Sequence, residues 1–374
     1  MRNCISFFVT VGALAAPAAA QSGAFVTRIG RDTLAVERYQ RTANRLDGEL
    51  VIRAPRTQHR IYAATLGPNG AVQRFDLTIH NLSDGGPAEQ KASILFQGDS
   101  AFVEQSDGKA QRLAVPAGSV PFLLNVYGLV EHLTGRARAA GGDEYNTTGV
   151  FPNANAPMAV VLKRVGGDSM TILMGQIGPL RLRVDQTGQL LGASGVGSTM
   201  QVTVERVPSL DIAAMGPAFA NRPLGVLSPT DSVQAMVGGA ALSVKYSRPA
   251  VRGRVIFGGV VPWNQVWRTG ANAATIFTTS ADLVMGGTTI PAGSYSLWTI
   301  PSSAGWKLII NKNTGQWGTN YDPQHDLAKL DMQVAALDAL IERFTIEISP
   351  KGERAGTLTL AWEGTRASVE FAKK

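Results

Sequence analysis

Short runs in which apolar and polar residues alternate dominate this sequence and constrain its fold more than any other feature. Examples are residues 48–53 (GELVIR), 74–80 (RFDLTIH) and 200–206 (MQVTVER). Successive side chains of a β-strand point to opposite faces of the sheet, so a period of two is typical of strands with one buried face. The sequence therefore predicts a mainly β protein.

One segment of the first half departs from this pattern. Residues 122–133 carry apolar side chains at helical spacing, and we expect a helix of about three turns there despite Gly128. The first half is then a curved antiparallel sheet with one helix laid on it. Such a half-barrel can hold a lipid or another apolar ligand. In the alternative, the helix fills the sheet and forms its core.

The second half of the chain differs from the first in residue pattern and composition. Strand-like runs recur between glycine turns such as Gly238-Gly239, with almost no helical pattern, which predicts a β-sandwich of jelly-roll type. All of the tryptophans fall in this part of the chain: Trp263, Trp267, Trp298, Trp306, Trp317 and Trp362. Residues 208–229 are rich in Pro, Ala and Gly without a sustained period. We therefore expect domains at 21–207 and 228–374, joined by a linker at 208–227.

The first twenty residues read as a signal peptide. Arg2 precedes a short apolar run at 5–14, and Ala18-Ala19-Ala20 supplies the small residues that signal peptidase needs. The apolar run is about half as long as the roughly 20 residues of a spanning helix. We therefore expect no transmembrane segment, cleavage near Ala20, and a periplasmic or extracellular bacterial protein.

Cys4 is the only cysteine and would be lost with the signal peptide. The mature chain would then have no disulfide, no thiol nucleophile and no cysteine-ligated metal. The four histidines show no metal-binding spacing such as H-E-x-x-H, and we expect no cofactor. Asp322 and Asp326 flank His325 and could together recruit a cation, but we favour the alternative of a solvated loop.

The chain carries a net charge of +7, and part of the excess is local. Eight arginines face only four acidic residues between positions 28 and 60. These arginines are Arg28, Arg31, Arg38, Arg41, Arg45, Arg53, Arg56 and Arg60. They form either a solvated outer face of a sheet or a surface for anionic lipid headgroups or polysaccharide. We do not expect nucleic acid as a partner, because no aromatic residues alternate with the arginines.

Several motifs of the second half occur in a fixed order: YSRP at 246–249, GRVIFGG at 253–259, VPW at 261–263, VWRTGAN at 266–272, IPAGSYSL at 290–297 and QWG at 316–318. In these motifs, residues 228–371 resemble the bacterial family called domain of unknown function 2911. The resemblance implies an exported, β-rich protein and no agreed activity. Asn272 is followed here by Ala273 and Ala274, where that family commonly has an acidic residue.

The VWRTGAN motif raises the question of a binding loop. The Arg268 guanidinium can hold a carboxylate or phosphate through two hydrogen bonds, and Asn272 offers a donor and an acceptor. With Trp267 and the surrounding candidates Trp263, Lys312 and Trp317, these residues suit a sugar ring or an anionic group. In the structural alternative Trp267 belongs to the core, Arg268 pairs with an acid, and Asn272 caps a turn.

These observations favour an exported, non-catalytic binding protein for a glycan, a lipid or a small anionic molecule. The alternative is an envelope hydrolase that uses carboxylates such as Asp282, Asp322 or Glu347, two of which would have to converge within about 5–10 Å. A third hypothesis is a purely structural, scaffolding role.

Overall fold

The computed structural model describes residues 21–374 except 84–86, 154, 176 and 196–199. The predicted signal peptide, residues 1–20, lies outside the described residues. Strands in two large sheets make up most of the described chain, so the prediction of a mainly β protein is confirmed. Among the described residues, no helix is long and apolar enough to cross a membrane.

The first sheet has the strand order β8-β7-β6-β5-β4-β3-β2-β1-β15-β14-β13-β12-β11-β10-β9. Neighbouring strands pair antiparallel, apart from the parallel pair β9 and β10. Its strands are β1 (Gln21–Ile29), β2 (Asp32–Arg41), β3 (Arg45–Ile52), β4 (Gln58–Leu66), β5 (Val72–Asn81), β6 (Glu89–Gln97), β7 (Ser100–Gln105), β8 (Ala110–Ala114), β9 (Val120–Pro121), β10 (Glu144–Val150), β11 (Met158–Arg164), β12 (Ser169–Met174), β13 (Ile177–Val184), β14 (Leu190–Ser194) and β15 (Val202–Val207). A 3₁₀ turn, η1 (Pro68–Gly70), precedes β5.

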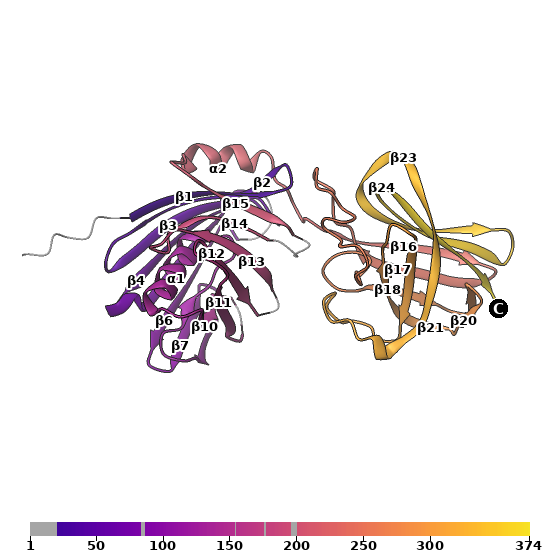
Figure 1. Ribbon diagram of the computed structural model, residues 1–374, viewed down its shortest axis with the longest axis horizontal. Coiled ribbons are helices and arrows are strands. Elements are labelled where there is room, and N and C mark those ends of the chain that lie inside the picture. Colours follow the sequence, from indigo (N-terminus) through magenta and orange to yellow (C-terminus); the bar gives the residue numbers. More distant parts are fainter. Residues whose placement is uncertain (1–20, 84–86, 154, 176, 196–199) are drawn as a thin grey trace, which may run out of the picture.

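The sheet curves around helix α1 (Tyr127–Ala140), as the sequence predicts (Figure 1). The predicted start of the helix at Phe122 is wrong, because α1 begins five residues later and runs further. Val120 and Pro121 form β9, and the backbone N–H of Phe122 still donates to the Val150 carbonyl oxygen at 2.9 Å. The apolar residues before Tyr127 therefore enter the core from an extended segment.

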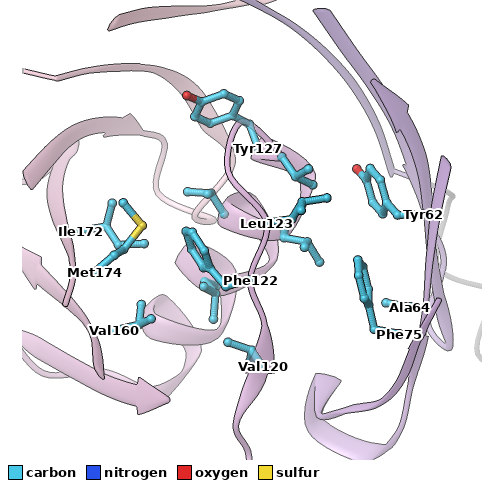
Figure 2. Packing of buried hydrophobic residues seen from close by; sticks show 14 of the residues in the cluster. Tyr62, Ala64, Phe75, Val120, Phe122, Leu123, Tyr127, Val160, Ile172 and Met174 are labelled. Atoms are coloured by element: carbon cyan, nitrogen blue, oxygen red, sulfur yellow. The ribbon is translucent and has the colours of Figure 1, made fainter. Parts of the chain in front are cut away.

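Helix α1 fills the concave face of the sheet. Phe122, Leu123 and Tyr127 lie between Tyr62 and Phe75 on one wall and the strands of the other wall (Figure 2). Most of the helix, including Leu129, Val130 and Leu133, is buried in the same cluster. Of the two alternatives for this half-barrel, the described residues therefore form the one in which the helix makes the core.

The N-terminus of α1 meets a buried carboxylate. Glu37 is 1% exposed and accepts hydrogen bonds from the backbone N–H of Tyr127 at 2.6 Å, from that of Gly128 at 3.1 Å and from the Tyr62 hydroxyl at 2.6 Å. The first N–H groups of a helix have no partner within the helix, and a carboxylate is favoured at that end. Burial nevertheless raises the pKa of Glu37 to about 7.

A second buried acid anchors the same helix. Glu131 accepts from the Tyr39 hydroxyl, from Gln21 Nε2 at 2.7 Å and from the backbone N–H of Leu190 at 2.9 Å. Arg206 pairs with it at 3.0 Å. Burial raises the pKa of Glu131 as well. Through Glu131, the helix is thus bonded to β1, β2, β14 and β15.

A second helix, α2 (Ile212–Ala220), lies on the opposite face of the sheet (Figure 1). The sequence does not predict it, because the segment lies in the expected linker and is too short to show a period. The Asp211 carboxylate accepts from the Ala214 N–H at 3.1 Å and caps the helix, and Ile212 packs on Val26, Val36 and Val51. Tertiary contact therefore makes a helix from a sequence that resembles a loop.

The second sheet has the strand order β16-β17-β18-β21-β22-β23-β24-β19-β20. Its strands are β16 (Thr230–Val237), β17 (Ala240–Ser247), β18 (Thr275–Thr279), β19 (Leu283–Met285), β20 (Thr288–Ile290), β21 (Gly293–Ile300), β22 (Trp306–Asn311), β23 (Asp326–Lys351) and β24 (Ala355–Lys373). A 3₁₀ turn, η2 (Pro323–His325), precedes β23.

The long strand β23 connects the two parts of the second sheet. It pairs with β22 from Asp326 to Met332 and with β24 beyond that point, while β16 also packs against it. The sheet therefore curls over its own core, which contains Phe277, Phe344 and Trp362.

The two halves meet through a specific contact. Arg252, a largely buried residue with a positive φ, pairs with Asp32 at 2.6 Å, and its carbonyl oxygen accepts from the Arg31 N–H at 2.9 Å. A side chain at Gly30 would overlap that carbonyl oxygen. The turn between β1 and β2 therefore fits closely against the loop that follows β17.

We expect Glu37 to make the protein less stable as the pH rises. The unfolded chain releases this proton near pH 4.5 and the folded chain only near pH 7, so the contribution of Glu37 is complete below pH 4.5 and is lost as the pH approaches 7. The difference corresponds to about 3 kcal/mol. Urea unfolding between pH 4.5 and 8 should show this slope in the wild type and a shallower one in Glu37→Gln. The same slope in both proteins would contradict it.

Candidate functional site

Trp267 lies in the core of the second sheet. Its indole is 5% exposed, stacks on Trp362 with ring centres 5.8 Å apart, and donates through Nε1 to the Gly270 carbonyl oxygen at 3.0 Å. Its backbone exchanges two hydrogen bonds with Thr299. The Trp267 side chain therefore fixes the start of the loop in the core, and the loop reaches the surface at Asn272 and Ala273.

The turn after Trp267 presents Arg268 and Asn272. Asn272 is exposed and has a φ of 61°, a conformation that Asn tolerates better than most residues. Arg268 is half-buried, donates through Nη1 to the Asn272 carbonyl oxygen at 3.3 Å, and has a pKa lowered by burial. The guanidinium thus bonds to the backbone of the turn at Asn272, whose side chain is exposed.

A distant segment, residues 316–318, lies directly against this turn. Trp317 forms an isolated β-bridge with Ala273, and the Gly318 N–H donates to the Asn272 carbonyl oxygen at 3.0 Å. A side chain at Gly318 would overlap Arg268. The Trp317 indole remains 51% exposed. Arg268, Asn272 and Trp317, hereafter the Trp317 face, therefore form one surface.

The β17 end approaches the same surface. Asn272 Nδ2 lies 3.5 Å from Ser247 Oγ and 3.4 Å from the Ser228 carbonyl oxygen. Three of the sequence motifs, YSRP, VWRTGAN and QWG, are therefore neighbours in space although up to about 70 residues separate them in the chain.

Two of the predicted site residues lie on other segments. Trp263 is 40% exposed and rests on Gly258, with its ring 6.1 Å from that of Phe257. Lys312 is exposed just after β22, where its backbone N–H donates to the His325 carbonyl oxygen. No hydrogen bond or ring contact joins either residue to Trp317 within the part of the chain that the structure describes.

The acidic residues considered as cation ligands, Asp322 and Asp326, bond to neighbouring protein groups. Asp322 accepts from the Gln324 N–H and lies 3.0 Å from His325 Nδ1, while Asp326 accepts from Asn311 at 2.9 Å and from the Tyr321 hydroxyl at 2.6 Å. Among residues 21–374, leaving aside the gaps given above, no group of three or more His, Cys, Asp or Glu side chains could hold a metal.

The acids considered for a hydrolase come from different elements. Asp282 follows β18 and accepts from the Ala292 N–H at 3.0 Å, Glu347 pairs with Thr359 in the sheet, and Asp322 caps η2. None of these three acids lines either of the two hollows found on the first sheet.

The sequence does not reveal a groove on the α2 side of the first sheet. This outer groove has a volume of about 1200 Å³ and is bordered by the segment before α2. Its lining includes Arg38, Arg45, Ile61, Arg183, Leu191, Val207 and Leu210. Strand alternation places Arg38 and Ile61 on outward faces, but only the pairing of β1 with β15 brings Arg183 near them.

Known proteins resemble this chain in parts. Residues 228–371 match the family model described as a protein of unknown function, DUF2911, which confirms the resemblance that the motifs indicate. No curated protein matches the chain. A crystal structure of a DUF1089 family protein from Pseudomonas aeruginosa is similar at 12% identity with a TM-score of 0.33, covering 50% of this chain and 95% of that chain. A β-barrel-like protein of domain of unknown function DUF1849 from Brucella abortus gives 14% identity, a TM-score of 0.34 and coverages of 50% and 95%.

Trp267 and Trp317 should differ sharply in their effect on stability. Trp267→Ala removes a buried indole and should lower the free energy of unfolding by about 3–5 kcal/mol. Trp317→Ala trims an exposed indole and should change it by less than about 0.5 kcal/mol. Urea unfolding followed by circular dichroism measures both, and equal losses would show that the assignment of Trp267 to the core and Trp317 to the surface is wrong.

Proposed function

We propose that this chain is a non-catalytic binding protein whose C-terminal domain recognises an acidic carbohydrate at the Trp317 face. The observation that carries the proposal is the convergence of Arg268, Asn272 and Trp317 on one surface from segments distant in the sequence. Each of these residues has a chemistry suited to part of such a ligand.

The half-exposed Trp317 indole offers an apolar face on which a sugar ring can stack, with an N–H at its edge. The Asn272 amide can both donate to and accept from hydroxyl groups. Arg268 adds a positive charge beside them. The planar guanidinium of an arginine can bind a carboxylate through two hydrogen bonds. An acidic sugar therefore fits this face better than a neutral one.

A binding role also agrees with the acids of this domain. The hydrolase alternative needs two carboxyl groups in one cleft, and neither hollow of the first sheet is lined by Asp282, Asp322 or Glu347. Polar recognition needs no such pair.

Export is part of the same proposal. The signal-peptide pattern supports cleavage near Ala20, which would place the protein outside the cytoplasm, where envelope carbohydrates are found. Expression of the full chain in a bacterial host and N-terminal sequencing of the purified protein test this point. We expect the mature chain to begin at Gln21 and to lie in the periplasm or medium. A cytoplasmic chain that keeps Met1 would contradict export without bearing on the Trp317 face.

Removal of the Trp317 indole should weaken carbohydrate binding. Isothermal titration with oligosaccharides of a hexuronic acid should show binding, and neutral oligosaccharides of the same length should bind more weakly. Trp317→Ala should reduce the affinity about tenfold, because stacking and the buried apolar area are both lost.

The matched control is Trp263→Ala, which removes an indole of similar exposure from another segment of the same domain. This variant should bind like the wild type. Failure of every oligosaccharide to bind, or equal losses in the two variants, would reject the Trp317 face as the site.

A further inference from the structure

We propose that the outer groove of the first sheet binds a single-chain amphiphile with an anionic headgroup, either carboxylate or phosphate. This site is separate from the Trp317 face and takes a ligand of different chemistry. The inference rests on how strand register arranges the side chains of the groove.

Helix α2 covers outward side chains of β1, β2 and β3, and Val207 and Leu210 also pack against this cluster. Val26, Val36 and Val51 lie opposite one another on β1, β2 and β3, and Ile212 of α2 packs over them. Two residues further along each strand, the outward side chains return to the same face of the sheet. The next rows therefore lie on the α2 side of the sheet as well.

The first of these open rows crosses five strands. Val207, Ala24, Arg38, Glu49 and Ile61 are direct partners in consecutive pairs from β15 to β4. All five line the groove, and Ile61 is 43% exposed. The row thus has apolar side chains at both ends and an ion pair between them.

The second of these rows contains small side chains, which leave room for a ligand in the groove. Ser22, Gln40, Asp47 and Ala63 are direct partners across β1 to β4 and line the same groove. Small side chains on β1 and β4 leave space above the backbone. Leu191 on β14 and Leu210 just before α2 add apolar surface to the groove. A hydrocarbon chain can therefore lie across the strands.

Positive charge exceeds negative charge in the groove. Arg38 donates to Glu49 at 2.6 Å, and Arg45 pairs with Asp47 at 2.7 Å. Arg206 pairs with Glu131 on the α1 side of the sheet.

Arg183 provides the charge that remains. It is exposed, lines the groove, and makes no hydrogen bond or ion pair with the described part of the chain. It lies in register with the row that α2 covers, through Gly192 and Glu205. A guanidinium in this position binds a carboxylate or phosphate well.

The ligand class follows from these two properties together. The apolar side chains of Leu191 and Val207, on β14 and β15, the next two strands after that of Arg183, complement a hydrocarbon tail, and the guanidinium complements an anionic head. A nucleotide fits less well: Tyr39 and Tyr62 border the groove, but they are only 3% and 1% exposed and so offer no stacking surface.

Titration of the full mature chain with twelve-carbon amphiphiles below their micelle concentrations tests the proposal. Laurate and dodecyl phosphate carry the two anionic heads, and dodecyltrimethylammonium and dodecyl maltoside carry cationic and neutral heads on the same tail. We expect an anionic probe to bind at least about tenfold more tightly than the cationic one, and the stronger anion identifies the carboxylate or phosphate source.

Charge reversal of Arg183 should abolish this preference. Arg183→Glu should weaken binding of the anionic probe about tenfold or more, whereas Arg181→Glu should have less than about a twofold effect. Arg181 is exposed on the same strand and lines a neighbouring hollow but not the outer groove. It therefore controls for the general surface charge.

Two further variants complete the test. Leu191→Asp should weaken all tailed probes, since it places a charge in the groove on β14, the strand next to that of Arg183, and Trp317→Ala should leave their binding unchanged. Equal affinity for the four headgroups, or equal losses in Arg181→Glu and Arg183→Glu, would overturn the proposal. A loss of amphiphile binding in Trp317→Ala would also overturn it, because the site would then belong to the other domain.

Discussion

The carboxylate of Glu37 joins the helix inside the first sheet to the strand that faces it. A wide, curved sheet has a concave face that must be filled, and α1 fills it with apolar side chains. A helix that begins inside a core carries N–H groups that need acceptors. Glu37 accepts hydrogen bonds from two of these N–H groups and from the Tyr62 hydroxyl. These bonds set the position of the helix along β2. The cost of burying this acid appears in its raised pKa.

Because α1 occupies the concave face, the surface available for binding lies on the other side of the sheet. There α2 covers a row of valines, and side chains of the next rows line the outer groove. The arginines of the first half consequently have different roles. Arg38 and Arg45 line the outer groove in ion pairs, and Arg53 donates to the Arg222 and Thr33 carbonyl oxygens. The solvated face predicted from their number is thus only part of their role.

The tryptophans of the second half of the chain differ in burial and therefore in role. Trp267 and Trp362 stack in the core, and the turn that begins at Trp267 emerges with Asn272 at the surface. Gly318 lets the Trp317 segment come close enough to touch that turn. A loop fixed from below by a buried indole can present polar groups in a defined arrangement without a regular strand around them.

Local pattern in the sequence determined the β-rich fold, the family of the second domain and the presence of a helix in the first. These features depend on alternation and motif order, which neighbouring residues express by themselves. The helix start at Tyr127 and the existence of α2 were decided by tertiary contacts, since Glu37 and the valine row lie far away in the chain. The contact of the Trp317 segment with the turn at Arg268, and the place of Arg183 and Arg38 in one groove, were likewise decided by the pairing of distant segments. Register between distant strands is set by the packing of the whole sheet, and no single segment encodes it.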